Sequence, residues 1–185
     1  MAHQEPSDAE LMAQLARGEV SAIGELARRH QGRVLELAFR TLGRLDSAED
    51  IAQETFLRVY RAAKTYQPQA KFTTWLYRIV VNLCLDEQRR LAKAAVPLES
   101  VVSDGLPASQ ENPAEKKELS ELVRAAVQEL PERQRLAVAL HRYDGLSHTE
   151  ISEVTGWTES AVESLLVRAY ATLREKPAKL ENLVE

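Results

Sequence analysis

Hydrophobic residues recur at helical spacing along most of the chain, beginning just after Ser7. The spacing of Ser7 and Glu10 predicts a capping box ahead of a short apolar stripe, and Gly18 is expected to end this first helix. A second helical pattern follows and stops at Gly43, although Gly32 could split or bend it. The beginning of the chain is therefore predicted to fold into helices.

Two further amphipathic helices are expected between Asp46 and Arg90. The first covers residues 48–63, with Asp46 or Ser47 as its cap. Its apolar stripe consists of Ile51, Thr55, Phe56, Val59 and Ala63. After a polar loop over residues 64–71, the second helix begins near Thr73. Its inward residues are Trp75, Leu76, Ile79, Val80 and Leu83. Together these patterns predict a compact bundle of about four helices that ends near residue 91.

Helical periodicity stops over residues 92–113, where prolines, a glycine and small polar residues predominate. This composition is typical of a flexible linker, so we expect two small domains, over residues 7–91 and 114–177. Residues 178–185 would form a C-terminal tail. The predicted fold class is all-α.

The second domain has the pattern of a helix-turn-helix. A helix is expected to begin at Pro131 and to stop at Gly145. Ser147 and Glu150 then form a second capping box. The turn is expected over residues 155–157, where Gly156 can adopt the left-handed conformation, and a longer helix follows. An ordinary helical hairpin would show the same pattern, so the segment alone leaves both interpretations open.

Composition narrows the function classes. The chain of 185 residues is 44% hydrophobic and 28% charged with a net charge of -4, so DNA binding would require local basic faces or a partner that supplies affinity. The single cysteine, Cys84, suits a reducing cytoplasm, and no apolar run is long enough to span a bilayer, so we expect a cytoplasmic protein without membrane insertion. The sequence shows no recognisable nucleophile, metal-ligand or phosphate-loop motif. We therefore expect no catalytic site, no metal and no cofactor.

Four segments carry a resemblance to a known family. They are DSAEDIAQETFLRVYRA, FTTWLYRIVVNLCLDEQRR, ELPERQRLAVALHRYDGLSHTEIS and AVESLLVRAYATLR. In this order they resemble small bacterial sigma factors of the extracytoplasmic-function (ECF) type, over nearly the whole chain. The resemblance implies two helical domains, called regions 2 and 4, that bind the clamp coiled coil and the flap of core RNA polymerase and direct the enzyme to promoter DNA. It also implies control by an anti-sigma factor.

The helix over residues 48–63 resembles the polymerase-binding part of region 2. The matching residues are Asp50, Gln53, Glu54, Phe56 and Leu57. Residues 46–57 contain four acids and no base, which suits a basic partner surface, while Leu57 would add apolar contact. Phe56 also lies on the apolar stripe. A solvated acidic helix face is the alternative interpretation.

The loop and the helix after it resemble the part of region 2 that recognises the -10 promoter element as single-stranded DNA. The matching residues are Tyr66, Lys71, Arg78, Ile79, Asn82, Arg89 and Arg90. By this resemblance Tyr66 and Ile79 would wall a pocket for a flipped base, Asn82 would contact the base, and the arginines would face phosphates. Trp75 matches a family tryptophan too, but its place on the apolar stripe favours core packing.

In the second domain the resemblance assigns recognition of the duplex -35 element to residues 158–174, in the major groove. The matching residues are Thr158, Glu159, Ser160, Ala161, Glu163, Ser164 and Arg168. The commoner family pattern has basic residues in place of Glu163 and Leu165. Because residues 158–176 hold three acids and three bases, this helix should bind duplex DNA weakly by itself. Glu163 could accept a hydrogen bond from a cytosine amino group.

Two other functions fit parts of the pattern. A helix-turn-helix regulator would bind its operator without polymerase, normally as a dimer, and would use the first bundle for sensing or dimerisation. A helical adaptor would bind polymerase without selecting promoters. Transcription with core polymerase separates both from a sigma factor.

Overall fold

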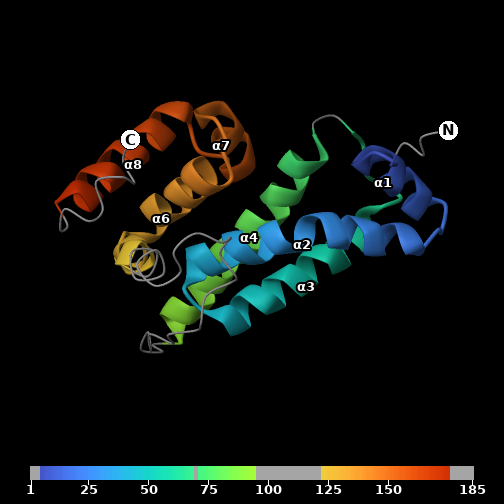
Figure 1. Ribbon diagram of the computed structural model, residues 1–185, viewed down its shortest axis with the longest axis horizontal. Coiled ribbons are helices and arrows are strands. Elements are labelled where there is room, and N and C mark those ends of the chain that lie inside the picture. Colours follow the sequence, from blue (N-terminus) through green and yellow to red (C-terminus); the bar gives the residue numbers. More distant parts are fainter. Residues whose placement is uncertain (1–4, 69–70, 95–121, 176–185) are drawn as a thin grey trace, which may run out of the picture.

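The computed structural model describes residues 5–68, 71–94 and 122–175, and within these ranges the protein is helical and contains no strand (Figure 1). The helices are α1 (Asp8–Ala16), α2 (Ser21–Leu42), α3 (Leu45–Ala62), α4 (Phe72–Lys93), α6 (Glu132–Val138), the π-helix η1 (Ala139–Tyr143), α7 (His148–Thr155) and α8 (Glu159–Arg174). Residues 122–128 are helical as well. The expected all-α fold is confirmed. Most of the expected linker and the whole expected tail lie outside the described residues.

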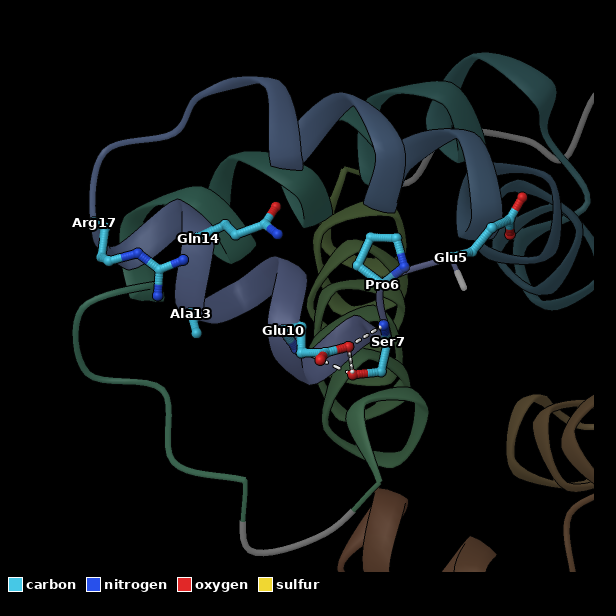
Figure 2. Close-up of a pocket in the computed structure, with 7 residues that line it drawn as sticks. All are labelled: Glu5, Pro6, Ser7, Glu10, Ala13, Gln14 and Arg17. Atoms are coloured by element: carbon cyan, nitrogen blue, oxygen red, sulfur yellow. Dashed lines mark hydrogen bonds between the residues drawn. The ribbon is translucent and has the colours of Figure 1, made fainter. Parts of the chain in front are cut away.

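The start of α1 has the predicted capping box (Figure 2). The Ser7 hydroxyl accepts a hydrogen bond from the Glu10 backbone N–H at 3.3 Å, and the Glu10 carboxylate accepts from the Ser7 backbone N–H at 2.7 Å. These bonds satisfy two backbone donors that a helix start otherwise leaves unpaired. The Ser7 hydroxyl also donates to the Glu10 carboxylate at 2.7 Å, and this bond, with the one from the Ser7 backbone N–H, holds the pKa of Glu10 below its ordinary value. The cap fixes where α1 begins.

Salt bridges hold α1 against α2. The Asp8 carboxylate lies 2.9 Å from His30 Nε2 and 3.3 Å from a guanidinium nitrogen of Arg29, and Arg29 also pairs with Glu25 at 2.7 Å. The buried residues Leu11, Met12 and Leu15 lie on the same side of α1 as Asp8, so the core contact and the salt bridges join one side of α1 to the rest of the bundle. α2 continues without a break through Gly32, so this glycine does not split the helix.

The junction between α2 and α3 differs from the expected cap. Gly43 has a φ of 73° and ends α2, as predicted, and a single residue later Arg44 is already the N-cap of α3. Asp46 and Ser47 therefore lie inside the first turn, and neither is the cap. The Arg44 carbonyl already accepts from the Ala48 backbone N–H at 3.1 Å, so the helix starts before either residue. Ser47 is buried, and its hydroxyl lies 3.1 Å from the Glu87 carboxylate of α4.

The core of the first half lies where α2, α3 and α4 meet. The predicted stripe of α3 is largely confirmed, because Ile51, Thr55, Val59 and Ala63 are buried and Phe56 is half-buried. On α4, Leu76 and Val80 are buried as expected, whereas Trp75, Ile79 and Leu83 are only half-buried. The remaining buried residues of α4 are Phe72, Thr74, Tyr77, Val81, Cys84 and Gln88. This face of α4 is wider than the predicted stripe because α4 packs against α2, α3 and α7.

The second half forms the predicted helix-turn-helix. Ser147 and Glu150 make the expected capping box at α7, and Gly156, with a φ of 73°, forms the turn before α8. Ile151, Val162 and Leu166 are all buried in one core, as the spacing predicts. The helix that begins after Pro131 ends in the π-helical turn η1, whose wider spacing the sequence did not indicate.

The two halves pack directly on each other. α7 lies against α4, while α6 and η1 contact α2 near its C-terminal end (Figure 1). Gln128 donates to the Arg40 carbonyl at 2.9 Å, and Arg135 donates to the Thr41 carbonyl at 3.2 Å. The Arg40 guanidinium lies 3.8 Å from the centroid of the Tyr143 ring. Polar contacts thus join the end of α2 to the second half.

Candidate functional site

One candidate surface is the outer face of α3. Asp50, Gln53 and Leu57 are exposed, Glu54 is partly exposed, and Phe56 is half-buried against the core. Leu57 retains 43% of its accessible surface. Tyr60, one turn further along, retains 49% and was not among the predicted residues. The face therefore combines carboxylates with two exposed apolar side chains, as a protein-binding surface does.

A cavity of about 530 Å³ extends this surface onto α4. It is lined by Ser47, Asp50, Ile51, Glu54, Arg58, Leu83, Asp86, Glu87 and Arg90. Asp86 and Glu87 were missed in the sequence because their alignment with Asp50 and Glu54 depends on how α3 and α4 pack. The only local signal that they belong to this surface was their helical spacing from Leu83, which also lines the cavity.

Arg90 lies in this cavity, although it was predicted to face DNA phosphates. Its guanidinium forms two hydrogen bonds of 2.7 Å with the Glu87 carboxylate. The same bonds, together with the Ser47 hydroxyl, hold the pKa of Glu87 below its ordinary value. In this arrangement Arg90 neutralises part of the acidic surface, and its contact with DNA stays a prediction.

A second candidate surface follows one side of α4. Arg78, Asn82 and Arg89 are exposed at spacings of four and seven residues, so they line one face of the helix. Asp86 pairs with Arg89 at 2.9 Å. An amide flanked by two guanidinium groups can contact a base edge and the adjoining phosphates.

Tyr66 and Ile79, the two residues predicted to wall the base pocket, are partly buried against the core. The Tyr66 ring packs edge-on against Trp75, with centroids 4.9 Å apart, and lies 6.2 Å from Phe72. Burial raises the pKa of the Tyr66 hydroxyl above its ordinary value. Trp75 is half-buried in this cluster, and Ile79 is half-buried one turn along α4. Residues 69–70 of the adjoining loop lie outside the described residues.

Arg78 and Lys71, two other predicted DNA contacts on this surface, interact with residues of the second half. The Arg78 guanidinium donates to the Glu153 carbonyl of α7 at 3.0 Å. Lys71, just before α4, lies 3.7 Å from the Glu150 carboxylate at the start of α7. Beside them, Tyr77 donates to the Asp144 carboxylate at 2.9 Å. The structure thus brings α7 onto the same end of α4 that the sequence assigned to DNA.

The third candidate surface is the outer face of α8. The predicted residues are exposed except Ala161, which is partly buried. Thr158 caps the helix by accepting from the Ala161 backbone N–H at 3.2 Å, and Arg168 donates to the Ser164 carbonyl at 3.0 Å. Leu165, where the family more often has a basic residue, is buried and supports the core. The Arg133 guanidinium lies over the ring of Trp157, in the turn, at 4.6 Å from the ring centroid.

Family models identify both halves of the chain. Sigma-70 region 2 matches residues 26–94, which include α3 and α4, and Sigma-70 region 4 matches residues 120–173, which include the helix-turn-helix. A chain that carries both regions is a sigma-70-type protein.

Curated relatives define the group within that class. The chain is 39% identical over 158 residues to the ECF RNA polymerase sigma factor SigE of Mycolicibacterium smegmatis, covering 84% of this chain and 61% of that protein. It is 35% identical over 170 residues to SigM of Mycobacterium tuberculosis, covering 91% and 84%, and 30% identical over 175 residues to SigW of Bacillus subtilis, covering 88% and 92%. This chain belongs to the ECF sigma factor family.

Solved structures agree on the fold. CnrH, solved in complex with the cytosolic domain of CnrY, superposes with a TM-score of 0.66 at 27% identity, covering 92% of this chain and 96% of that one. The sigma factor RpoE of Bartonella quintana, solved with the anti-sigma factor NepR, gives 0.63 at 17% identity, covering 87% and 95%. Among the described residues, no helix is long and apolar enough to cross a membrane.

Proposed function

We propose that this protein binds core RNA polymerase and directs it to promoters, where its second half reads the duplex -35 element and its first half captures the unpaired -10 element. The observation that carries this proposal is the presence of both sigma-70 regions in one chain, each with a candidate contact surface on a helix. The protein acts by binding, in the cytoplasm where polymerase works, and nucleotide addition belongs to the partner enzyme.

The surface for polymerase is the acidic face of α3. Asp50, Gln53, Glu54, Phe56 and Leu57 form the primary contact, and the carboxylates of the adjoining cavity extend it. Charged groups of this kind steer association with a basic coiled coil, while exposed Leu57 supplies apolar burial. The flap of polymerase would contact the second half.

The surface for the unpaired -10 element is the exposed side of α4. In this proposal Asn82 contacts the base, Arg78, Arg89 and Lys71 contact phosphates, and the half-buried Tyr66 and Ile79 support the base from the side. Because bases are read here after strand separation, this surface acts when the promoter opens.

The surface for the -35 element is the outer face of α8. Exposed Glu159, Ser160, Glu163 and Ser164 precede Arg168 on the helix, so a major-groove approach would bring the N-terminal residues to base edges and Arg168 to the backbone. With few cations on this helix, the protein relies on polymerase for most of its DNA affinity.

We also propose that an anti-sigma factor controls the protein. Both structural relatives above were solved with a bound partner: RpoE with the anti-sigma factor NepR, and CnrH with the cytosolic domain of CnrY. Such a partner would cover the same α3 and α4 surfaces that polymerase and DNA require.

The test is reconstitution with purified core polymerase. The protein should co-elute with core on gel filtration, and the mixture should yield run-off transcripts from a pool of genomic fragments on which core alone yields none. If the protein instead fails to bind core and footprints duplex DNA by itself, the sigma function is lost in favour of a helix-turn-helix regulator.

A further inference from the structure

Two histidines of the second half lie beside each other, outside the three candidate surfaces. His141 belongs to η1, and His148 is the first residue of α7, so the turn over residues 144–147 separates them. Their ring centroids are 5.4 Å apart, and the ring planes are inclined at 46°. The two side chains meet because the chain turns between η1 and α7, and not because they share one helix face.

The separation of the two rings fits a shared transition-metal ion. An imidazole nitrogen binds zinc at about 2.0–2.1 Å, so two histidines on one tetrahedral ion have ring centroids roughly 5 Å apart. The observed 5.4 Å is close to this value. Both side chains are partly exposed, so an ion can reach them from solvent and keep water in its other coordination positions.

Tyr170 of α8 orients one of the two rings. The Nδ1 atom of His141 lies 3.1 Å from the Tyr170 hydroxyl. When Nε2 of His141 binds a metal ion, Nδ1 carries the proton and donates it to the tyrosine oxygen. Such a partner behind the ligand fixes the orientation of the ring, and it ties the site to α8 as well as to α7.

The electrostatic surroundings favour a neutral ligand but limit the affinity. Burial, followed by the nearby His148 and Arg142, lowers the pKa of His141 below its ordinary value, so the ring is neutral as a metal ligand must be. Within the described residues, no third His, Cys, Asp or Glu side chain joins the pair. The exposed Arg142 guanidinium also opposes a bound cation. The protein therefore offers two ligands only.

We propose that His141 and His148 form a two-histidine site for a divalent late transition-metal ion such as Zn²⁺, with Tyr170 as the positioning residue for His141. The ion would bridge η1 and α7 across the turn and stabilise the helix-turn-helix half. Two ligands supply about half the binding free energy of a four-ligand site, so we expect a dissociation constant of roughly 1–200 µM. This inference is independent of the sigma function.

Isothermal titration of the metal-free protein with zinc chloride tests the site without polymerase or DNA. The parent should bind an ion with micromolar affinity, and His148→Gln should weaken this binding about tenfold or more. His30→Gln removes a histidine of α2 that pairs with Asp8, and should bind zinc as the parent does. Circular dichroism verifies that each variant folds. Equal affinity in the parent and His148→Gln overturns the proposal, as does a parent that binds no zinc.

Two neighbouring variants test the geometry of the site. Tyr170→Phe keeps the ring but removes the oxygen that orients His141, so zinc affinity should fall about tenfold. A hydroxyl with a purely structural role would change stability and leave zinc affinity intact. Arg142→Gln removes the opposing cation and should tighten zinc binding. Unchanged affinity in Tyr170→Phe overturns the positioning role, and unchanged affinity in Arg142→Gln overturns the placement of the ion beside this residue.

Thermal unfolding tests whether the ion bridges the two elements. Zinc at about ten times its dissociation constant should raise the unfolding midpoint of the parent by roughly 3–6 °C, and a chelator should reverse the rise. His148→Gln should show little or no rise at the same zinc concentration. A midpoint that rises equally in both proteins would assign the stabilisation to other groups and overturn the bridge.

Discussion

In the proposed function, Asn82 is the residue on which base capture depends most directly. Its side chain is exposed on α4 between Arg78 and Arg89, so the core does not depend on it. An amide in this position can donate to and accept from a base edge, which a guanidinium cannot do. Its contribution should therefore appear in promoter opening and not in stability.

We predict that Asn82→Ala lowers promoter opening by roughly 5- to 150-fold, the loss expected when a base contact worth about 1–3 kcal/mol is removed. Permanganate reactivity of unpaired thymines in the polymerase–promoter complex measures this step. Gln31→Ala, which removes an exposed amide from α2, is the matched control and should open promoters normally. Equal opening by both variants would contradict the assignment.

Asp50 is the exposed carboxylate at the centre of the acidic surface, on the rim of the cavity between α3 and α4. Asp50→Lys should weaken binding to core polymerase about tenfold or more, because it places a cation against a basic partner. Competition with a labelled sigma factor for core would measure the change. Glu19→Lys makes the same charge change at an exposed position before α2, and should leave the affinity intact. A similar loss in both would indicate general charge effects and not a defined surface.

Among the elements, the helix-turn-helix depends on the backbone of its turn. Gly156 has a φ of 73°, in the left-handed region where a side chain is strained, whereas Gly32 lies inside α2, where an added Cβ would meet nothing within 4 Å. The same substitution should thus have opposite effects at the two positions.

Gly156→Ala should lower the free energy of unfolding by about 1 kcal/mol or more, and Gly32→Ala should raise it by roughly 0.5–1 kcal/mol. Urea titration followed by circular dichroism measures both. If Gly156→Ala were as stable as the parent, the tight turn would not constrain the second half as described.

Most of these elements could be predicted because their signals are local. The capping boxes at Ser7 and Ser147 and the stops at Gly43 and Gly156 each depend on a few neighbouring residues. The cap of α3 could not be predicted correctly, since Arg44 caps without a side-chain bond and the sequence favoured Asp46 or Ser47 for their chemistry. Polar residues close to a helix start are thus ambiguous until the preceding turn is known.

The site was predictable only in part, because some of its contacts depend on packing between helices. The exposed row on α4 follows from helical spacing, and so does the bond between Arg90 and Glu87, three residues apart. The position of Arg90 beside α3 depends on how the two helices pack, which no local pattern indicated. The contacts of Arg78 and Tyr77 join residues more than sixty positions apart. Such contacts arise from packing between the halves, so no pattern within either half could predict them.

For the whole molecule, the interface between the halves should respond to pH. Burial raises the pKa of Asp144 to about 6. The hydrogen bond from Tyr77 and the Arg40 and Arg33 guanidinium groups of α2 lower this pKa, and Glu36 raises it. If separation of the halves returns this pKa toward its ordinary value of 3.8, the packed state binds the proton more tightly. Packing of the halves is then strongest at low pH and weakens as pH rises through about 6.

Energy transfer between dyes at Ala13→Cys on α1 and Ala171→Cys on α8, two exposed positions, should therefore rise when the free protein is moved from about pH 8 to about pH 5. Asp144→Asn keeps the shape of the side chain but cannot titrate in this range, so its transfer should change little. A pH response as large in this variant as in the parent would assign the effect to other groups.

The most direct measurement of the sigma function is to sequence the 5′ ends of transcripts made from genomic DNA by core polymerase with and without this protein. We predict a set of starts that requires the protein and shares two upstream motifs, one at the -35 and one at the -10 position, as its two DNA-reading halves demand. Starts that are the same in both reactions, or that share no upstream motif, would contradict the proposed function.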